Sequence, residues 1–265
     1  MAFRRFLRGR VEWDRLESVA RAIAERYGED EVRIEFLEAD NWLSTPCVVN
    51  ERWFVKIITE QNSLVHALLT TGRNIGAFTS GTEGFFDHFG TAYGMAEHEF
   101  EATKKLREIG INAPEPIEAF EFEDLGVLVL EYLPEFRTLN ELSDSEALAY
   151  APDLFESLAT MHDNSLAHGD LRGENVLIAN NTLYFIDATN VKASGLADAR
   201  SYDLACGLAA LEPLIGAGPA VDAALESYRV DELLAAQDFL DFINMRPDHD
   251  FEAGVVKGEI EKRAA

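Results

Sequence analysis

The chain has 265 residues, 47% of them hydrophobic, and a net charge of −25 at pH 7. This length and apolar content suffice for one large core or two lobes, which excludes a wholly disordered chain. A surface this acidic repels polyphosphate backbones and argues against general nucleic-acid binding by the body of the protein. At molar salt the Debye length falls to about 3 Å and the self-repulsion is screened, so the charge predicts a halophilic source.

The first 26 residues differ in charge from the rest, because they hold seven arginines against four acidic residues. Two interpretations of residues 1–30 are open. One is a basic arm that binds RNA, a ribosome or another acidic partner, and the other is a frayed terminus that leads into an ordinary helix. Apolar residues recur at helical spacing from Val11 to Tyr27 and stop before Gly28, so we expect a helix there.

Neither export nor a membrane span is expected. No run of 18 apolar residues occurs, and the N-terminus lacks the apolar core of a signal peptide. We therefore expect a cytoplasmic protein without membrane contact. Cys47 and Cys206 are too few for a disulfide framework or a zinc site, and we expect both to be small buried hydrophobic residues.

Three strands are expected after the first helix. The segment Val32–Phe36 alternates between apolar and polar residues, and Thr45–Val49 and Trp53–Ile58 predict a hairpin around the polar turn 50–52. Lys56 lies inside the third of these strands, with apolar residues on both sides.

A helix and a further strand follow. Ala96 to Ile109 has helical spacing, and Glu99 shares its apolar face with Ala102 and Leu106, which predicts an acid that points inward. The unbroken apolar run Gly126–Leu130 predicts a buried strand, and Pro134 a turn shortly after it.

The most informative stretch is His168-Gly-Asp-Leu-Arg-Gly-Glu-Asn175, with Asp187 twelve residues later. In a kinase catalytic loop an Asp accepts the acceptor hydroxyl's proton, an Asn five residues on holds one Mg²⁺, and an Asp after the next strand holds another. Asp170, Asn175 and Asp187 have this spacing, and the apolar segments that separate the last two predict a two-stranded ribbon. The alternative is an acidic surface loop that contains these residues by chance.

The kinase scheme assigns roles to the earlier residues. Lys56 then corresponds to the strand lysine that contacts the α- and β-phosphates of ATP, and Glu99 to its acidic partner on a helix. Glu131 offers its carbonyl and Leu133 its N–H to adenine, with Leu130 behind the ring. ATP and Mg²⁺ are therefore the expected cofactors.

These motifs resemble those of the RIO family of atypical protein kinases and, more loosely, the small kinase of the KEOPS tRNA-modification complex. His98-Glu-Phe100 followed by the segment 110–117 is similar to the family's Glu-Phe helix and its Val-Pro-x-Pro exit. Ile186-Asp-Ala-Thr-Asn190 resembles the family's Ile-Asp-x-x-Gln metal motif, and no Ala-Pro-Glu activation segment follows it.

The resemblance spans residues 32–215 and implies an α+β, two-lobed protein-kinase-like fold. Its β-rich N-lobe is expected over 31–133, after an N-terminal basic helix at 1–30, and its reduced helical C-lobe over 134–265. An insert at 61–94, rich in glycine, is either a mobile linker or a loop that folds over the nucleotide or contacts the substrate.

Two positions depart from the family pattern. Residues 38–46 contain no glycine, although a phosphate loop normally needs glycine so that backbone N–H groups can approach the phosphate oxygens. Ser44 stands where RIO proteins carry a serine and is expected to donate its hydroxyl instead. Arg172 stands where many kinases have a lysine, and it either meets the γ-phosphate or faces solvent.

The sequence thus predicts an ATP- and magnesium-dependent phosphotransferase, in the first place a RIO-like serine/threonine protein kinase or ATPase. Two alternatives remain open: a small-molecule phosphotransferase of the aminoglycoside or choline kinase type, and a nucleotide-gated switch for ribosome assembly with little kinase activity. The phosphoacceptor is accordingly a protein or a small molecule.

Overall fold

The computed structural model of the chain describes residues 11–37, 44–60, 91–188, 196–246 and 249–265. The chain divides into two compact units, with the main boundary after Pro134. Residues 105–113 belong to the C-terminal unit, although they precede this boundary. None of the helices in the described ranges is long and apolar enough to span a membrane.

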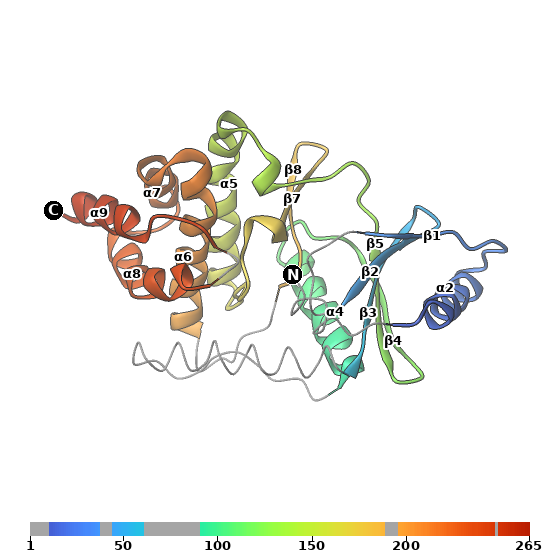
Figure 1. Cartoon of the computed structure of the whole chain (residues 1–265). Helices are drawn as coiled ribbons and strands as arrows, with labels where there is room; N and C mark the ends of the chain where they lie inside the picture. Colours follow the sequence, from blue (N-terminus) through green and yellow to red (C-terminus); the bar gives the residue numbers. More distant parts are fainter. Residues whose placement is uncertain (1–10, 38–43, 61–90, 189–195, 247–248) are drawn as a thin grey trace. The chain divides into compact units, whose positions relative to one another are not determined.

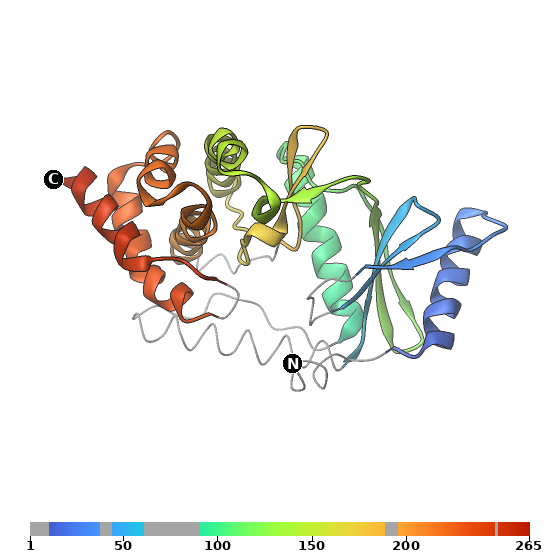
Figure 2. The same cartoon turned by 45° about the horizontal axis from the view of Figure 1, so that its top comes forward.

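The N-terminal unit is a five-stranded antiparallel sheet of order β1-β2-β3-β5-β4. Helices α2 and α4 lie on its two opposite faces (Figures 1 and 2). Its elements are α2 (Trp13–Tyr27), β1 (Ile34–Phe36), β2 (Thr45–Val49), β3 (Trp53–Ile58), α4 (Ala92–Glu108), β4 (Pro116–Phe122) and β5 (Leu125–Glu131).

The alternation of side chains along β3 assigns Lys56 to one face of the sheet. Val55 and Ile57 pack with the apolar stripe of α2, whereas Ile58 packs with Met95 of α4. Successive side chains of a strand point to opposite faces. Lys56 therefore shares the α4 face with Ile58.

The C-terminal unit is mainly helical and carries a small antiparallel sheet of order β6-β7-β8. Its elements are β6 (Arg137–Thr138), the 3₁₀ turn η1 (Leu139–Glu141), α5 (Asp144–Asp163), the 3₁₀ turn η2 (Gly173–Asn175), β7 (Val176–Ala179), β8 (Thr182–Phe185), α6 (Leu196–Ile215), α7 (Ala217–Leu225), α8 (Val230–Asn244) and α9 (Ala253–Ala264). The fold is thus α+β, with a sheet-rich N-terminal part and a helical C-terminal part.

Helix α6 is the buried centre of the C-terminal unit, since every residue from Tyr202 to Leu211 is buried. The apolar run predicts a helix start at Asp203, and this prediction is wrong by seven residues, because α6 begins at Leu196. Before Tyr202 only Ala199 is buried, so the first turns of α6 carry a helical backbone without the apolar pattern.

The predicted ribbon between the proposed magnesium ligands is confirmed as β7 and β8. Its turn residues Asn180 and Asn181 have φ angles of 50° and 59°. Two successive positive φ angles are typical of a tight hairpin turn, and asparagine tolerates them better than most residues.

Candidate active site

The N-terminal unit places Lys56 and Glu99 in direct contact. The Lys56 Nζ donates to Glu99 Oε1 at 2.5 Å, and the two side chains are 5% and 18% exposed. A lysine inside a sheet needs a close carboxylate to offset the loss of hydration of its ammonium group. The spacing of β3 and α4 thus delivers the pair that the sequence predicts.

The residues expected around adenine lie at the end of β5. Leu130 and Leu133 are buried, and Ser44, at the entry to β2, is buried as well. The Glu131 N–H donates to the carbonyl of Glu115 at 2.8 Å, so it is not available to a ligand. Among the described residues, no backbone carbonyl accepts from the Leu133 N–H.

In the C-terminal unit, Asp170 and Asn175 are tied together across the loop. Asn175 Nδ2 donates to the Asp170 carbonyl at 2.8 Å, and this bond directs the amide oxygen of Asn175 away from that carbonyl. Gly173 lies between them, and a Cβ there would lie 1.9 Å from the side-chain oxygen of Asn140, so a larger residue would displace the Asn140 side chain. The loop therefore holds two predicted site residues at a fixed separation.

The ribbon of β7 and β8 brings Asp187 back close to Asn175. The Ile186 N–H donates to the Asn175 carbonyl at 3.1 Å. Asp187 is the next residue in the chain, so it lies beside this contact. Asp187 has a φ of 59°, in the left-handed region. A non-glycine residue in this region costs conformational energy and is found preferentially at functional sites.

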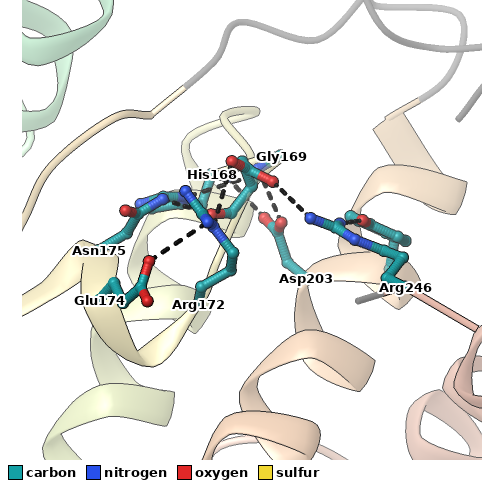
Figure 3. Close-up of polar contacts among 9 residues, drawn as sticks. His168, Gly169, Arg172, Glu174, Asn175, Asp203 and Arg246 are labelled. Atoms are coloured by element: carbon teal, nitrogen blue, oxygen red, sulfur yellow. Dashed lines mark hydrogen bonds and ion pairs between the residues drawn. The ribbon is translucent and has the colours of Figure 1, made fainter. Parts of the chain in front are cut away.

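Asp203 anchors the loop, and local motifs did not identify it. This carboxylate is fully buried on α6 and accepts from the backbone N–H of His168 at 2.6 Å and of Gly169 at 2.8 Å (Figure 3). The buried His162 lies 3.3 Å from it through Nε2 and bonds to Tyr228 through Nδ1 at 2.7 Å. The only sequence signal is an acidic residue at the head of an apolar run.

The buried imidazole of His168 lies among acidic groups. Burial lowers the pKa of His168 below its ordinary value, and the charges of Asp203, Asp170 and Asp187 oppose this shift. A neutral imidazole is therefore favoured at the start of the loop.

Two arginines, Arg172 and Arg246, contact the Asp170 carboxylate. Arg172 Nε lies 3.5 Å from Asp170 Oδ2, and Arg172 also pairs with Glu174 at 3.4 Å. Arg246, which sequence reasoning missed, donates to Asp170 Oδ1 at 3.1 Å. In this structure Arg172 thus contacts the proposed base and is only partly exposed.

The donor set fits magnesium. Mg²⁺ prefers oxygen ligands and is commonly held by one or two side chains together with substrate phosphates. Asn175 and Asp187 supply an amide oxygen and a carboxylate, whereas no cluster of three or more His, Cys, Asp or Glu side chains suited to a metal occurs in the described part of the chain. Such a pair suits a metal that arrives with a nucleotide better than a preformed zinc or calcium site.

The RIO domain family matches residues 87–195. This range contains Glu99, the catalytic loop and Asp187. This part of the chain is thus similar to a RIO domain. No curated protein sequence matches it significantly.

The fold of the chain is similar to that of an aminoglycoside-3'-phosphotransferase of type VIII. The TM-score is 0.53 at 17% identity, over 85% of this chain and 97% of that one. The kinase domain of Mycobacterium tuberculosis PknI, in a C20A mutant, matches with a TM-score of 0.44 at 13% identity, over 89% and 96% of the two chains. At this identity, the phosphotransferase match establishes the fold alone.

Some predicted features lie outside the described residues. These are the glycine-free segment from residue 38 to residue 43, most of the insert at 61–94, and the Thr189 and Asn190 positions of the metal motif. The first four arginines of the basic segment also lie outside. Two arginines of this segment that the structure describes pair with carboxylates: Arg15 contacts Asp124, and Arg26 contacts Glu118.

Proposed function

We propose that this chain, which matches the RIO domain over residues 87–195, transfers the γ-phosphoryl group of ATP to a hydroxyl, with a serine or threonine side chain of a protein as the first candidate acceptor. The observation that carries the proposal is the continuous set of hydrogen bonds that joins Asp170 to Asn175 and Asn175 to the residue before Asp187. A kinase needs these three groups close together, and they come from a loop and from the end of a strand.

Asp170 would orient the acceptor hydroxyl and accept its proton. The acceptor oxygen then forms a bond to the γ-phosphorus, the bond from that phosphorus to the bridging oxygen breaks, and ADP leaves with the electron pair. Asn175 and Asp187 would hold Mg²⁺, which neutralises phosphate charge when it is bound. Positioning and charge neutralisation account for most catalysis of this kind.

Lys56, fixed by Glu99, would contact the α- and β-phosphates. Ser44, Leu130, Glu131 and Leu133 would bind the rest of the nucleotide, Glu131 through its carbonyl oxygen. The ordered Lys56–Glu99 pair supports this assignment, because an ion pair of this kind must be in place in active protein kinases.

A small-molecule phosphotransferase is the second candidate. Helix α6 begins at Leu196, nine residues after Asp187, which leaves little chain for the activation segment on which protein kinases bind peptides. A nucleotide-gated switch in ribosome assembly, with binding of an acidic partner by the basic N-terminus, is the third candidate, supported by the glycine-free segment and the clustered arginines of the sequence.

One experiment separates the three candidates. The purified protein is incubated with γ-labelled ATP and a lysate of its own cells, in molar KCl, and the label is resolved into protein, small molecules and free phosphate. Label in protein supports the first proposal, and label in a small molecule supports the second. Free phosphate alone supports the switch.

Two alanine variants test the division of labour at the site. Asp187→Ala should lose Mg²⁺-dependent ATP binding, because the phosphate charge is then poorly compensated. Asp170→Ala should keep nucleotide affinity within a few fold while turnover falls by a factor of about 10² or more, the range for loss of a positioned base. Calorimetry and phosphate transfer are measured in parallel.

Glu99→Gln should fall between these variants, since Lys56 remains but loses its partner. Parental Mg-ATP binding by Asp187→Ala, or parental turnover by Asp170→Ala, would contradict the assignment.

A further inference from the structure

Two adjacent residues of α6 reach the catalytic loop by different routes. Asp203 holds the loop backbone at His168 and Gly169. Tyr202 reaches the loop through the side chain of Arg246, because its hydroxyl accepts a hydrogen bond from Arg246 Nη1. The other terminal nitrogen of the same guanidinium, Nη2, donates to Asp170 Oδ1 at 3.1 Å.

The guanidinium of Arg246 therefore bridges a fixed phenol and the proposed base. Tyr202 is fully buried, and the side chains of Arg246 and Asp170 are only 10% and 11% exposed. An ion pair with so little exposure is costly to desolvate and persists only with good geometry. The planar fork of arginine meets this condition, since it can donate to two acceptors at once, whereas a lysine ammonium lacks the fork.

A second arginine in the described part of the chain, Arg172, constrains Asp170 less. The Arg172 side chain is 23% exposed, and its Nε lies 3.5 Å from Asp170 Oδ2. The same guanidinium also pairs with Glu174. In Figure 3, Arg172 lies to the left of Asp203 and Arg246 to its right. Of these two arginines, Arg246 lies closer to the Asp170 carboxylate, and it is also the one that a buried residue, Tyr202, holds in place.

We propose that Arg246 is a positioning residue for the phosphotransfer reaction. Held by Tyr202, it fixes the Asp170 carboxylate through Oδ1 in the orientation that receives the acceptor hydroxyl. The inference rests on the proposed role of Asp170 as the base. Helix α6 then sets both the backbone of the loop, through Asp203, and the carboxylate of its base, through Tyr202 and Arg246.

The test compares Arg246→Met, Arg246→Lys and Tyr202→Phe. Turnover is followed with γ-labelled ATP as phosphate release and as label in protein, and Mg-ATP affinity is measured by calorimetry. For Arg246→Met we expect kcat to fall by a factor of about 10 to 10², since small misplacements of a catalytic group cost this much. The Kd and the KM for Mg-ATP should change by no more than about twofold.

Partial rescue is the signature of positioning as opposed to packing. Arg246→Lys keeps the charge without the fork, so its kcat should lie between those of the parent and Arg246→Met. Tyr202→Phe removes the anchor and should lower kcat less than Arg246→Met does. The double variant Tyr202→Phe, Arg246→Met should be no slower than Arg246→Met alone, because both changes break the same connection.

Arg263→Met is the matched control. Arg263 is also a largely buried arginine of the C-terminal unit, but it contacts Asp222 and Glu259 and not the catalytic loop. Its loss should lower the melting temperature and leave kcat unchanged. If Arg246→Met does not fold, Arg246→Lys and Tyr202→Phe still test the connection.

Three results would overturn the inference: parental or increased kcat in Arg246→Met, additive losses in the double variant, or a loss of kcat that merely follows the melting temperature. Asp170→Asn separates this failure from failure of the proposed function. If Asp170→Asn turns over at the parental rate, the proposed base is wrong. If Asp170→Asn is inactive while Arg246→Met is unaffected, only the positioning role is wrong.

Discussion

Asp203 shows how one buried carboxylate can determine the shape of the proposed catalytic loop. Its two oxygens accept from two successive backbone N–H groups, with Oδ2 on His168 and Oδ1 on Gly169. Buried donors that lose their acceptor retain the full penalty of desolvation. The loop conformation therefore depends on a residue that lies 35 positions away from His168 in the sequence.

We predict that Asp203→Asn is nearly as damaging as Asp203→Ala, with a loss of about 3 kcal/mol in the free energy of unfolding. An asparagine offers one acceptor oxygen and sets an NH₂ group against a backbone N–H. Urea unfolding measures the effect. Asp163→Asn, at an exposed position, should change stability by less than about 0.5 kcal/mol, and an equally small change for Asp203→Asn would contradict the anchoring role.

The same contrast explains which site residues the sequence can predict. Asp170, Asn175 and Asp187 could be proposed from the sequence, because phosphoryl transfer calls for these residue types at this local spacing. Arg246 could not be predicted from the sequence, because its contact with Asp170 joins residues 76 positions apart. No local pattern marks such a contact, which depends on how α6 and α8 pack.

Among the elements, α4 and β5 approach each other unusually closely. A Cβ on Gly126 of β5 would lie 2.1 Å from the carbonyl oxygen of Ala92, at the start of α4. Both groups belong to the backbone, so neither can move alone. Gly126 therefore sets the depth at which α4, and Glu99 with it, lies on the sheet.

Gly126→Ala should lower the free energy of unfolding by about 2 kcal/mol, within the range for overpacked cores. It should also weaken Mg-ATP binding, because a displaced α4 lengthens the Lys56–Glu99 contact. Thermal unfolding and calorimetry measure the two effects. Gly258→Ala in α9, where a Cβ meets nothing within 4 Å, is the control and should stabilise by up to about 1 kcal/mol.

Helix α2 is attached to β4 by a titratable contact. The Tyr27 hydroxyl donates to Glu118 Oε2 at 3.0 Å, and burial and this bond raise the pKa of Tyr27 to about 12. The unfolded chain ionises near pH 10. The stabilisation by the neutral phenol is therefore complete below pH 10 and is lost as the pH rises to about 12.

Tyr27→Phe should remove this alkaline dependence. We expect the melting temperatures of the parent and the variant to converge between pH 10 and pH 12, and to differ by a constant amount between pH 7 and pH 9. A constant difference across the whole range would show that the Tyr27 proton does not contribute.

Elements were more predictable than their boundaries. The hairpin of β2 and β3 and the ribbon of β7 and β8 follow the alternating pattern and the turn residues closely. The start of helix α6 does not follow the apolar pattern. Its first turns are only slightly buried, so the apolar residues begin to recur after the helix has already started.

At the scale of the whole molecule, the net charge of −25 is the dominant feature. Most ion pairs in the described ranges have at least one exposed partner and contribute little individually. Repulsion among the excess carboxylates therefore opposes the compact state in dilute buffer. Salt that screens this repulsion should favour folding.

If the acidic surface is an adaptation to a saline cytoplasm, the melting temperature should rise steeply as KCl is increased from dilute to molar. Calorimetric scans over this range test the proposal. A melting temperature that is flat or falling would remove the halophilic interpretation.

The α+β architecture and its kinase-like character follow from the sequence because both depend on periodicity and on a few chemically constrained residues. The substrate does not, because the acceptor is selected by surfaces whose composition is not dictated by the transfer reaction. The short connection to α6 reduces the room for a peptide platform, but it does not specify an acceptor.

The two cysteines give the molecule one internal reporter for each unit. Cys47 belongs to the N-terminal unit and Cys206 to the C-terminal unit, and both are buried. Burial raises the pKa of Cys47 to about 12 and that of Cys206 further, so thiol reagents, which need the thiolate, should modify neither in the native state. Each modification then records the opening of its own unit. Mass spectrometry of the two labelled peptides over time should show whether the units unfold in one event or in two, and nucleotide should slow the labelling of whichever unit it stabilises.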